Sequence, residues 1–262
     1  NDLGSQWMAD RINGHLVTGY RWFDPDGLFR RKNVYVAYSR TSDFEDNISR
    51  AGMFLSAGAE FENYWGFNFN TNYNFESVST TLTRGGPKLN MPENFSFNLN
   101  AYSDSREKIT LSPFVSYWEN EIGSNEKYFG FEVEWKPNSQ ISFSVGPEYG
   151  TNFTSYQWVG NFKDDFAVNT YNYRYVFADL NQETISANIR LNWIFTPTLS
   201  LQLYLQPLFS AGNYENFKEI NNPPTLEANT YGHQGSTIDY DADEMIYSVD
   251  PDAEGPAEQF SF

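Results

Sequence analysis

Apolar and polar residues alternate strictly along several stretches of the chain. Between positions 199 and 206 the odd positions are all leucine, and the even positions hold Ser200, Gln202, Tyr204 and Gln206. The stretch 185–195 has the same pattern, with apolar residues at every odd position. A period of two residues is typical of a β-strand with one apolar face. Because only residues 196–198 separate the two stretches, we expect them to form an antiparallel hairpin.

The same alternation recurs over most of the chain. Strong runs cover 65–73, 95–100, 129–136 and 141–146, and weaker runs lie near Leu16, Val34, Met53, Ile109, Phe153 and Tyr171. These runs predict about twelve strands, most of them near the ~10 residues that a tilted membrane-spanning strand needs. No stretch of comparable length repeats every 3.6 residues, so the pattern predicts an all-β protein.

The connections between the predicted strands fall into two groups. One side is expected to carry the short connections 62–64, 104–108, 136–140, 161–165 and 196–198, and the other side the longer ones 42–52, 76–93 and 120–126, with a further short loop at 179–183. Short turns at one end and longer loops at the other are typical of an outer-membrane barrel. Tyr and Trp near strand ends, such as Tyr20, Trp22, Tyr64 and Trp65, fit its interfacial girdles.

These patterns predict a transmembrane antiparallel up-and-down β-barrel. Apolar side chains would face lipid, and Asn, Ser, Gln and Glu would face the lumen. A soluble β-sandwich or barrel whose aromatic residues fill the core fits alternation alone equally well.

Composition sharpens this prediction. Phe (23) and Tyr (18) both outnumber Leu (16), which is unusual for a soluble domain. The formal charge of −17 excludes nucleic acid as a partner, because such a partner requires a basic surface. There is no cysteine, and so no disulfide or thiolate metal site. The chain opens without a targeting segment, so we expect a mature protein or a piece of one.

The negative charge is concentrated near the end of the chain. Residues 212–262 hold eleven acidic residues and one basic residue, Lys218. We therefore expect two regions, the barrel strands and loops at 1–211, and an acidic extracellular loop or tail at 212–262 that leads toward further strands.

Charged residues on the polar faces of predicted strands are candidates for the lumen wall. They would bind water, pair with one another or tune the selectivity for solutes. These lumen-lining candidates are Glu132, Glu134, Lys136, Arg174 and Arg190.

The acidic tail contains one weak candidate for a Ca²⁺ site. Its alternating carboxylates resemble the start of a calcium loop, but Glu244 stands where an EF-hand needs glycine, and Asp250 where it needs a bidentate glutamate. A solvated acidic loop explains the run more simply. The candidate ligands are Asp239, Asp241, Asp243 and Glu244.

Catalytic motifs are missing from the sequence. The two histidines, His15 and His233, have no Gly-x-Ser-x-Gly motif beside them, and there is no Walker loop or His-Glu-x-x-His motif. We therefore assign no catalytic residue and no cofactor other than the weak Ca²⁺ candidate.

Four segments carry a resemblance to a known family. They are Asn1–Gly4, Arg174–Leu180, Ser186–Pro197 and Leu199–Pro207, and the phrase Phe-Thr-Pro-Thr-Leu-Ser-Leu-Gln-Leu-Tyr at 195–204 is the most specific part. The chain resembles the C-terminal barrel domain, itself of unknown function, of Bacteroidetes-type outer-membrane proteins with an N-terminal family 9 carbohydrate-binding-like domain. The resemblance implies that this chain is an interior part of a larger barrel.

The resemblance and the strand pattern together set the functional expectations. The leading one is an integral protein of the bacterial outer membrane, acting as a pore, transporter or surface scaffold associated with glycan handling. Its partners would be the lipid bilayer and lipopolysaccharide, with glycans or other outer-membrane proteins as further candidates. The alternatives are an outer-membrane hydrolase that uses loop carboxylates, and a soluble β-rich binding module.

Overall fold

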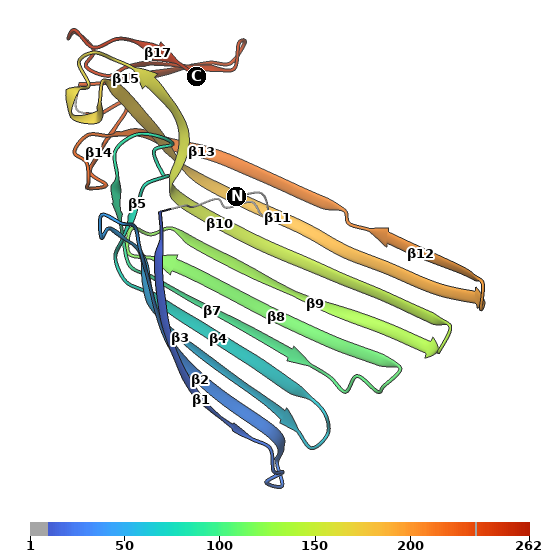
Figure 1. The fold of residues 1–262 in the computed structure, drawn as a ribbon. Helices are drawn as coiled ribbons and strands as arrows, with labels where there is room; N and C mark the ends of the chain where they lie inside the picture. Colours follow the sequence, from blue (N-terminus) through green and yellow to red (C-terminus); the bar gives the residue numbers. More distant parts are fainter. Residues whose placement is uncertain (1–9, 234) are drawn as a thin grey trace.

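The computed structural model describes residues 10–233 and 235–262, and it is an all-β structure, as predicted (Figure 1). In the described residues the only helix is the short 3₁₀ turn η1 (Val168–Thr170). Three sheets contain all the strands. The largest has 12 strands, the second is formed by β15–β17, and the third by β5 and β6. The strands are β1 (Ile12–Trp22), β2 (Phe29–Ser42), β3 (Ile48–Phe61), β4 (Gly66–Asn74), β5 (Ser77–Ser79), β6 (Leu89–Met91), β7 (Asn94–Tyr102), β8 (Ile109–Asn120), β9 (Asn125–Asn138), β10 (Ile141–Lys163), β11 (Tyr173–Thr196), β12 (Leu199–Leu205), β13 (Leu208–Ile220), β14 (Ala228–Thr230), β15 (Thr237–Asp241), β16 (Ile246–Asp250) and β17 (Phe260–Ser261).

The main sheet is an antiparallel meander. Its order is β1-β2-β3-β4-β7-β8-β9-β10-β11-β13-β14, so strands that follow one another in the chain also pair in space, except around β5, β6 and β12. β12 and β13 both pair with the long β11 and are interrupted at Gln206 and Pro207. The predicted hairpin is confirmed, because β11 and β12 are joined by Pro197 and Thr198.

Four connections differ from the prediction. The expected longer loops at 42–52 and 120–126 are short, with only residues 43–47 and 121–124 between the strands. Residues 161–165 do not form a short turn at the end where β11 turns into β12. β10 instead continues to Lys163, and its connection to β11 lies at the opposite, long-loop end. Residues 179–183 are not a loop, because they lie inside the 24-residue strand β11. The separate strands predicted near Phe153 and Tyr171 are therefore absent. Phe153 lies within β10, and Tyr171 lies in the β10–β11 connection.

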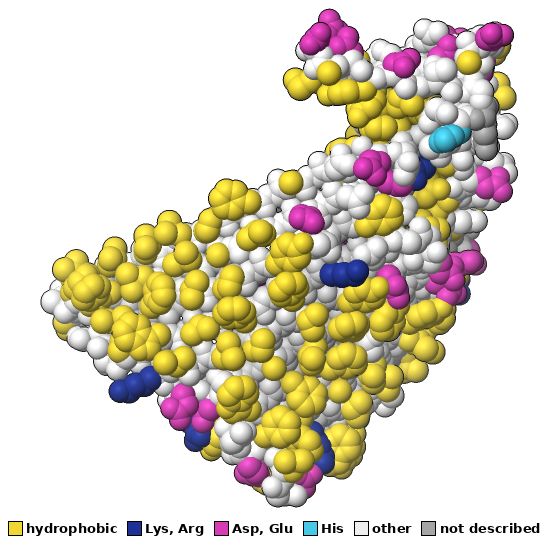
Figure 2. All heavy atoms as spheres, turned by 180° about the vertical axis from the view of Figure 1, so that it is seen from behind, with side chains coloured by type: hydrophobic (Ala, Val, Ile, Leu, Met, Phe, Trp, Pro, Cys, Tyr) yellow, Lys and Arg dark blue, Asp and Glu magenta, His cyan; other side chains and the backbone are white. Residues whose placement is uncertain are grey.

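Strand register gives the main sheet one apolar and one polar face, as the alternation predicted. Phe129 pairs with Val115 and Tyr149, and Leu203 pairs with Leu191, so apolar side chains form continuous rows across neighbouring strands. On the opposite face Asn70 pairs with Asn98, and Asn74 with Asn94. Figure 2 shows the apolar side chains spread over one side of the sheet. Many of them are exposed, Leu16 by 72% and Phe209 by 74%.

Side chains on the polar face are crowded. Ser144, Gly146 and Gly150 of β10 are buried, whereas Phe129 and Phe131 on the apolar face of β9 are more than 40% exposed. A Cβ atom at Gly150 would overlap the ring of Tyr128. Because side chains on the inside of a curved sheet converge, this crowding indicates that the sheet curves toward its polar face.

The expected closed barrel is not formed by the described residues. β1 pairs only with β2, and β12 pairs only with β11, so two long strand edges remain open. Figure 1 shows these edges apart from each other. Residues 10–233 and 235–262 therefore form a curved, open sheet. Among them no helix is long and apolar enough to cross a membrane.

The buried core lies at the long-loop end rather than between the long strands. Beyond Phe153, β10 has no pairing with β9, and β10, β11 and β13 extend together past the rest of the sheet. Two core clusters cover the two faces of this extension. One contains Val176, Ala178, Phe217, Tyr231 and Val249, with β15–β17 packed against it. The other contains Leu89, Tyr175, Phe177 and Ile220.

Because of the extension, the main sheet continues further along the chain than the sequence predicted. The predicted boundary between residues 211 and 212 falls inside β13, which continues to Ile220. The acidic segment that follows forms β14 and the small β15–β17 sheet, and these strands supply part of the covering of the extension.

Candidate functional site

Three of the predicted lumen-lining residues lie together on the polar face of β9. Glu134 pairs in register with Thr110 of β8 and Ser144 of β10, and Ser144 pairs with Arg190 of β11. Glu132 and Lys136 are two residues away on either side of Glu134, and so share its face. The structure therefore brings Glu132, Glu134, Lys136 and Arg190 onto one polar surface.

The carboxylate of Glu134 is held at both oxygens. Its Oε1 accepts a hydrogen bond of 2.8 Å from the Ser142 hydroxyl, and its Oε2 lies 2.7 Å from Nζ of Lys136. Both side chains remain partly exposed. An ion pair of this kind contributes little to stability, but it fixes the position of a negative charge on the polar surface.

Arg190 has a different environment from Glu134. Its guanidinium carbon lies 5.0 Å from the centre of the Tyr204 ring, and it has no carboxylate within ion-pair distance in the described part of the chain. The Tyr204 hydroxyl in turn donates to Asn188, and the Asn188 amide donates to Glu148. Arg190 therefore supplies an available positive charge, two strands away from Glu134.

Arg174 does not join this surface. It lies at the start of β11, in the extension, and only 12% of its side chain is exposed. Its Nε donates to Asp164 at 2.6 Å, and its Nη1 donates to Glu219 at 2.6 Å. Asp164 is in the β10–β11 connection and Glu219 is in β13, so Arg174 joins two elements of the loop end.

Charge and burial shift the pKa of Asp164 in opposite directions. Burial disfavours the ionised carboxyl, but the backbone N–H of Phe166 and the guanidinium of Arg174 stabilise it, so the pKa of Asp164 lies below its ordinary value of 3.8. Beside this group, burial raises the pKa of the Tyr231 phenol. The Tyr231 hydroxyl has no hydrogen-bond partner within the described residues. The loop end thus contains a buried group of polar side chains inside an apolar core. The group consists of Asp164, Arg174, Glu219 and Tyr231.

The acidic run of the tail forms a hairpin turn. Asp239 and Asp241 lie on β15, and the Asp241 carboxylate accepts hydrogen bonds from the backbone N–H groups of Asp243 and Glu244. No group of three or more acidic or histidine side chains in the described ranges is placed to hold a metal ion. The carboxylates predicted for Ca²⁺ are therefore not gathered into one site.

The two histidines lie apart from every cluster described above. His15 is exposed on β1, and the backbone carbonyl of His233 accepts a 2.7 Å hydrogen bond from the Ser236 hydroxyl in a turn.

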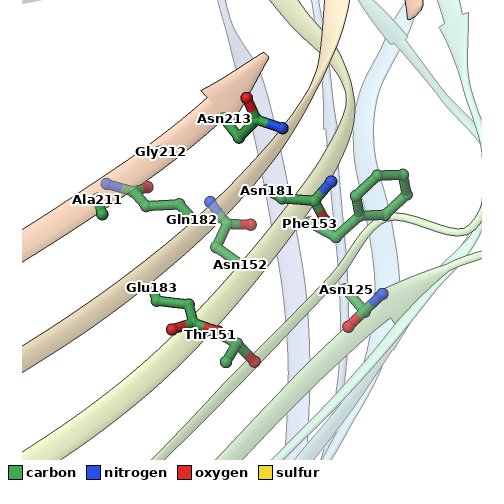
Figure 3. A pocket seen from close by; sticks show the side chains of 10 residues that line it. All are labelled: Asn125, Thr151, Asn152, Phe153, Asn181, Gln182, Glu183, Ala211, Gly212 and Asn213. Atoms are coloured by element: carbon green, nitrogen blue, oxygen red, sulfur yellow. The ribbon is translucent and has the colours of Figure 1, made fainter. Parts of the chain in front are cut away.

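A hollow of about 600 Å³ lies near the loop end of β9, β10, β11 and β13 (Figure 3). Most of its lining belongs to the apolar face, at the height where that face becomes polar. A row of Phe129, Tyr149, Ile185 and Phe209 is followed by one of Lys127, Thr151, Glu183 and Ala211, and then by one of Asn125, Phe153, Asn181 and Asn213. The lining residues are Asn125, Thr151, Asn152, Phe153, Asn181, Gln182, Glu183, Ala211, Gly212 and Asn213.

Neither the hollow nor the buried ion pairs follow from the sequence pattern. The amide residues of the hollow come from four strands, and only strand register brings them to one height. A usable signal is the point in each strand where the apolar alternation stops, because these points align across neighbouring strands.

The fold and its surfaces define a class of protein, an all-β chain built on a long antiparallel meander with one polar and one exposed apolar face. Residues 1–250 match the family described as a domain of unknown function, DUF5916, and the chain belongs to this family. No curated protein and no solved structure matches the chain.

Proposed function

We propose that this chain forms part of the wall of an integral outer-membrane β-barrel. The observation that carries the proposal is the exposed apolar face. Large apolar side chains are exposed on β1, β2, β9, β11, β12 and β13, in register with one another. A soluble protein rarely exposes an apolar patch of more than a few hundred Å². A closed sheet in lipid buries such a face and satisfies every backbone group.

The opposite face fits the lumen of such a barrel. It carries Asn, Ser and Gly along β4 and β7, and a mixed set of charges around Glu134 and Arg190. A polar, charged interior supports the passage of hydrophilic solutes and sets a preference among ions. We infer that the protein acts as a pore or transporter for polar solutes, or as a membrane anchor for a surface assembly.

The unequal loops at the two ends of the sheet support an orientation of the chain in the membrane. The connections at one end have only two to six residues, such as Pro197–Thr198, whereas the other end carries β5–β6, the β10–β11 connection and the β15–β17 sheet. Outer-membrane barrels have short periplasmic turns and longer extracellular loops. The extension with its buried core would then lie on the outside of the cell.

Because the native chain has no cysteine, single-cysteine labelling tests the proposal directly. Val133→Cys lies on the apolar face and Glu132→Cys on the polar face of the same strand. After reconstitution into vesicles, a fluorophore at position 133 should be quenched by nitroxide lipids, and position 132 should react with a charged water-soluble thiol reagent. Quenching at neither position, or an equal reaction of both with the water-soluble reagent, would exclude a lipid-facing apolar surface.

A further inference from the structure

The hollow on the apolar face has a lining suited to hydroxyl-rich ligands. Five of its ten residues have carboxamide side chains, three of them on the apolar face (Asn125, Asn181 and Asn213), which offer both donors and acceptors, and Thr151 adds a hydroxyl. Glu183 lies beside Thr151 in the register and in Figure 3, and its carboxylate can accept strong hydrogen bonds from hydroxyl groups. Its volume of about 600 Å³ lies within the range of ~300–1,000 Å³ that is typical of ligand sites.

Part of this hydrogen-bonding capacity is not used within the protein. The Asn213 amide donates to Glu215, the Asn125 amide donates to the Gly123 carbonyl, and the Gln182 amide, on the other face, donates to Ser210. The side-chain amide of Asn181 makes no hydrogen bond to the described part of the chain, and it lies near the Phe153 ring (Figure 3). The ring provides an apolar surface beside polar groups, a combination that suits the alternating C–H and O–H faces of a sugar ring.

The charge at the hollow argues against an anionic ligand. Glu183 is part of the lining, and Glu215 lies next to Asn213. Lys127 is in the same row as Thr151 but is not part of the lining. A phosphate or carboxylate in the hollow would lie close to Glu183 without a facing cation among the lining residues, and that arrangement is unfavourable.

The position of the hollow identifies the kind of molecule that would fill it. The row Phe129, Tyr149, Ile185 and Phe209 ends the apolar part of this face, and the hollow begins one row further on. If the apolar face contacts lipid tails, this height is where lipid headgroups lie, including those built from sugars. This step depends on the membrane placement proposed above.

We propose that the hollow binds a neutral sugar, presented as the headgroup of a glycolipid in the outer leaflet. The carboxamides of Asn125, Asn181 and Asn213 would bind the sugar hydroxyls, and Phe153 would contact the ring. The same chemistry would accept a free neutral oligosaccharide, so the experiment compares the two sources.

The test uses the full chain in two states. In the first, vesicles of phosphatidylcholine with a neutral monoglycosyl diacylglycerol supply the headgroup, and native mass spectrometry counts the glycolipid molecules retained. In the second, the chain in detergent is titrated with a soluble neutral oligosaccharide. The variant Asn125→Leu/Asn181→Leu removes two amides from the lining. Lys127→Gln, one row from Asn125 on the same strand and outside the lining, is the matched control.

The wild-type chain and Lys127→Gln should retain the glycolipid in preference to phosphatidylcholine, and the double variant should lose about tenfold in affinity, as expected for one or two lost hydrogen bonds. Binding of the soluble sugar alone, lost in the double variant, would support the site and assign it to free glycans. The proposed sugar site would be overturned if all three proteins bound equally in both states, or if none of them bound in either state. If the chain does not float with the vesicles in a density gradient, the proposed membrane placement is refuted. The titration in detergent would still show whether the hollow binds a sugar.

Discussion

Nη1 of Arg174 lies 2.6 Å from both carboxylate oxygens of Glu219, a residue 45 positions further along the chain. The same guanidinium binds Asp164 through Nε. One buried cation therefore fastens the β10–β11 connection to β13, and the loop end is held by charge as well as by its apolar core.

Removal of one partner should loosen the extension. Glu219→Gln leaves Arg174 buried with one carboxylate, Asp164, instead of two, so the cost should lie below the ~3–5 kcal/mol that breaking a buried pair typically costs when the remaining charge is uncompensated. We expect faster hydrogen exchange in residues 164–176 and in β14, with unchanged exchange at the short-turn end. Arg106→Gln, which breaks the ion pair of the exposed Arg106 with the buried Asp104 at the short-turn end, is the matched control. Slow exchange in the extension of Glu219→Gln would contradict this assignment.

Acid should loosen the same region before it affects the strands of the sheet. The pKa of Asp164 lies below 3.8 in the folded chain, so its stabilising contribution is complete above the ordinary value and is lost as the pH falls through the lowered pKa. Protease resistance of the β10–β11 connection should therefore decrease as the pH is lowered below about 3.8.

Asp164→Asn should be sensitive to protease already at neutral pH and should show little further change in acid. Asp165→Asn, in an exposed pair with Lys163, serves as the control and should behave like the native chain. The proposal fails if Asp164→Asn keeps the acid sensitivity of the native chain.

A cation introduced on the apolar face should block insertion into lipid. Leu203→Arg places its charge among Leu191 and its neighbours, and arginine at the centre of a lipid-facing barrel surface costs about 2–4 kcal/mol. Gln202→Arg, on the opposite face of the same strand, should insert normally. Heat-modifiable gel mobility after folding into vesicles measures both yields, and equal yields would mean that the apolar face does not meet lipid.

Charge on the polar surface should control ion preference if that surface lines an open lumen. Glu132→Gln/Glu134→Gln removes two negative charges while Arg190 stays, so the ratio of cation to anion permeability in planar bilayers should decrease, most clearly at low salt where screening is weak. Glu62→Gln, in the tight β3–β4 turn, removes a charge away from this surface and should leave the ratio unchanged. An unaltered ratio in the double variant would place these carboxylates outside the conducting path.

Local alternation was sufficient to predict which side chains share a face. Phe129, Phe131 and Val133 lie on the apolar face and Glu132 and Glu134 on the polar one, because a strand has a period of two whatever its neighbours are. The hairpin at Pro197 also followed from sequence, since so short a connection permits only antiparallel pairing.

The extension could not be predicted in the same way. β10 contains register shifts between Thr154 and Gln157 and between Trp158 and Gly160, which interrupt its alternation. Polar residues near Lys163 and Asp165 resemble a short turn, although the strand continues to Lys163 because β11 pairs with it. Tertiary pairing therefore decides the length of these strands. The ion pairs of Arg174 join distant segments and leave no local pattern.

The two open edges of the main sheet run in opposite directions. β1 descends from the long-loop end toward the tight turns, and the β12–β13 line ascends from the tight turns to the long-loop end. In an antiparallel barrel each neighbour must reverse direction. These edges can therefore pair with each other directly or through an even number of inserted strands, and never through an odd number. Any complete assembly built on this sheet must satisfy that parity.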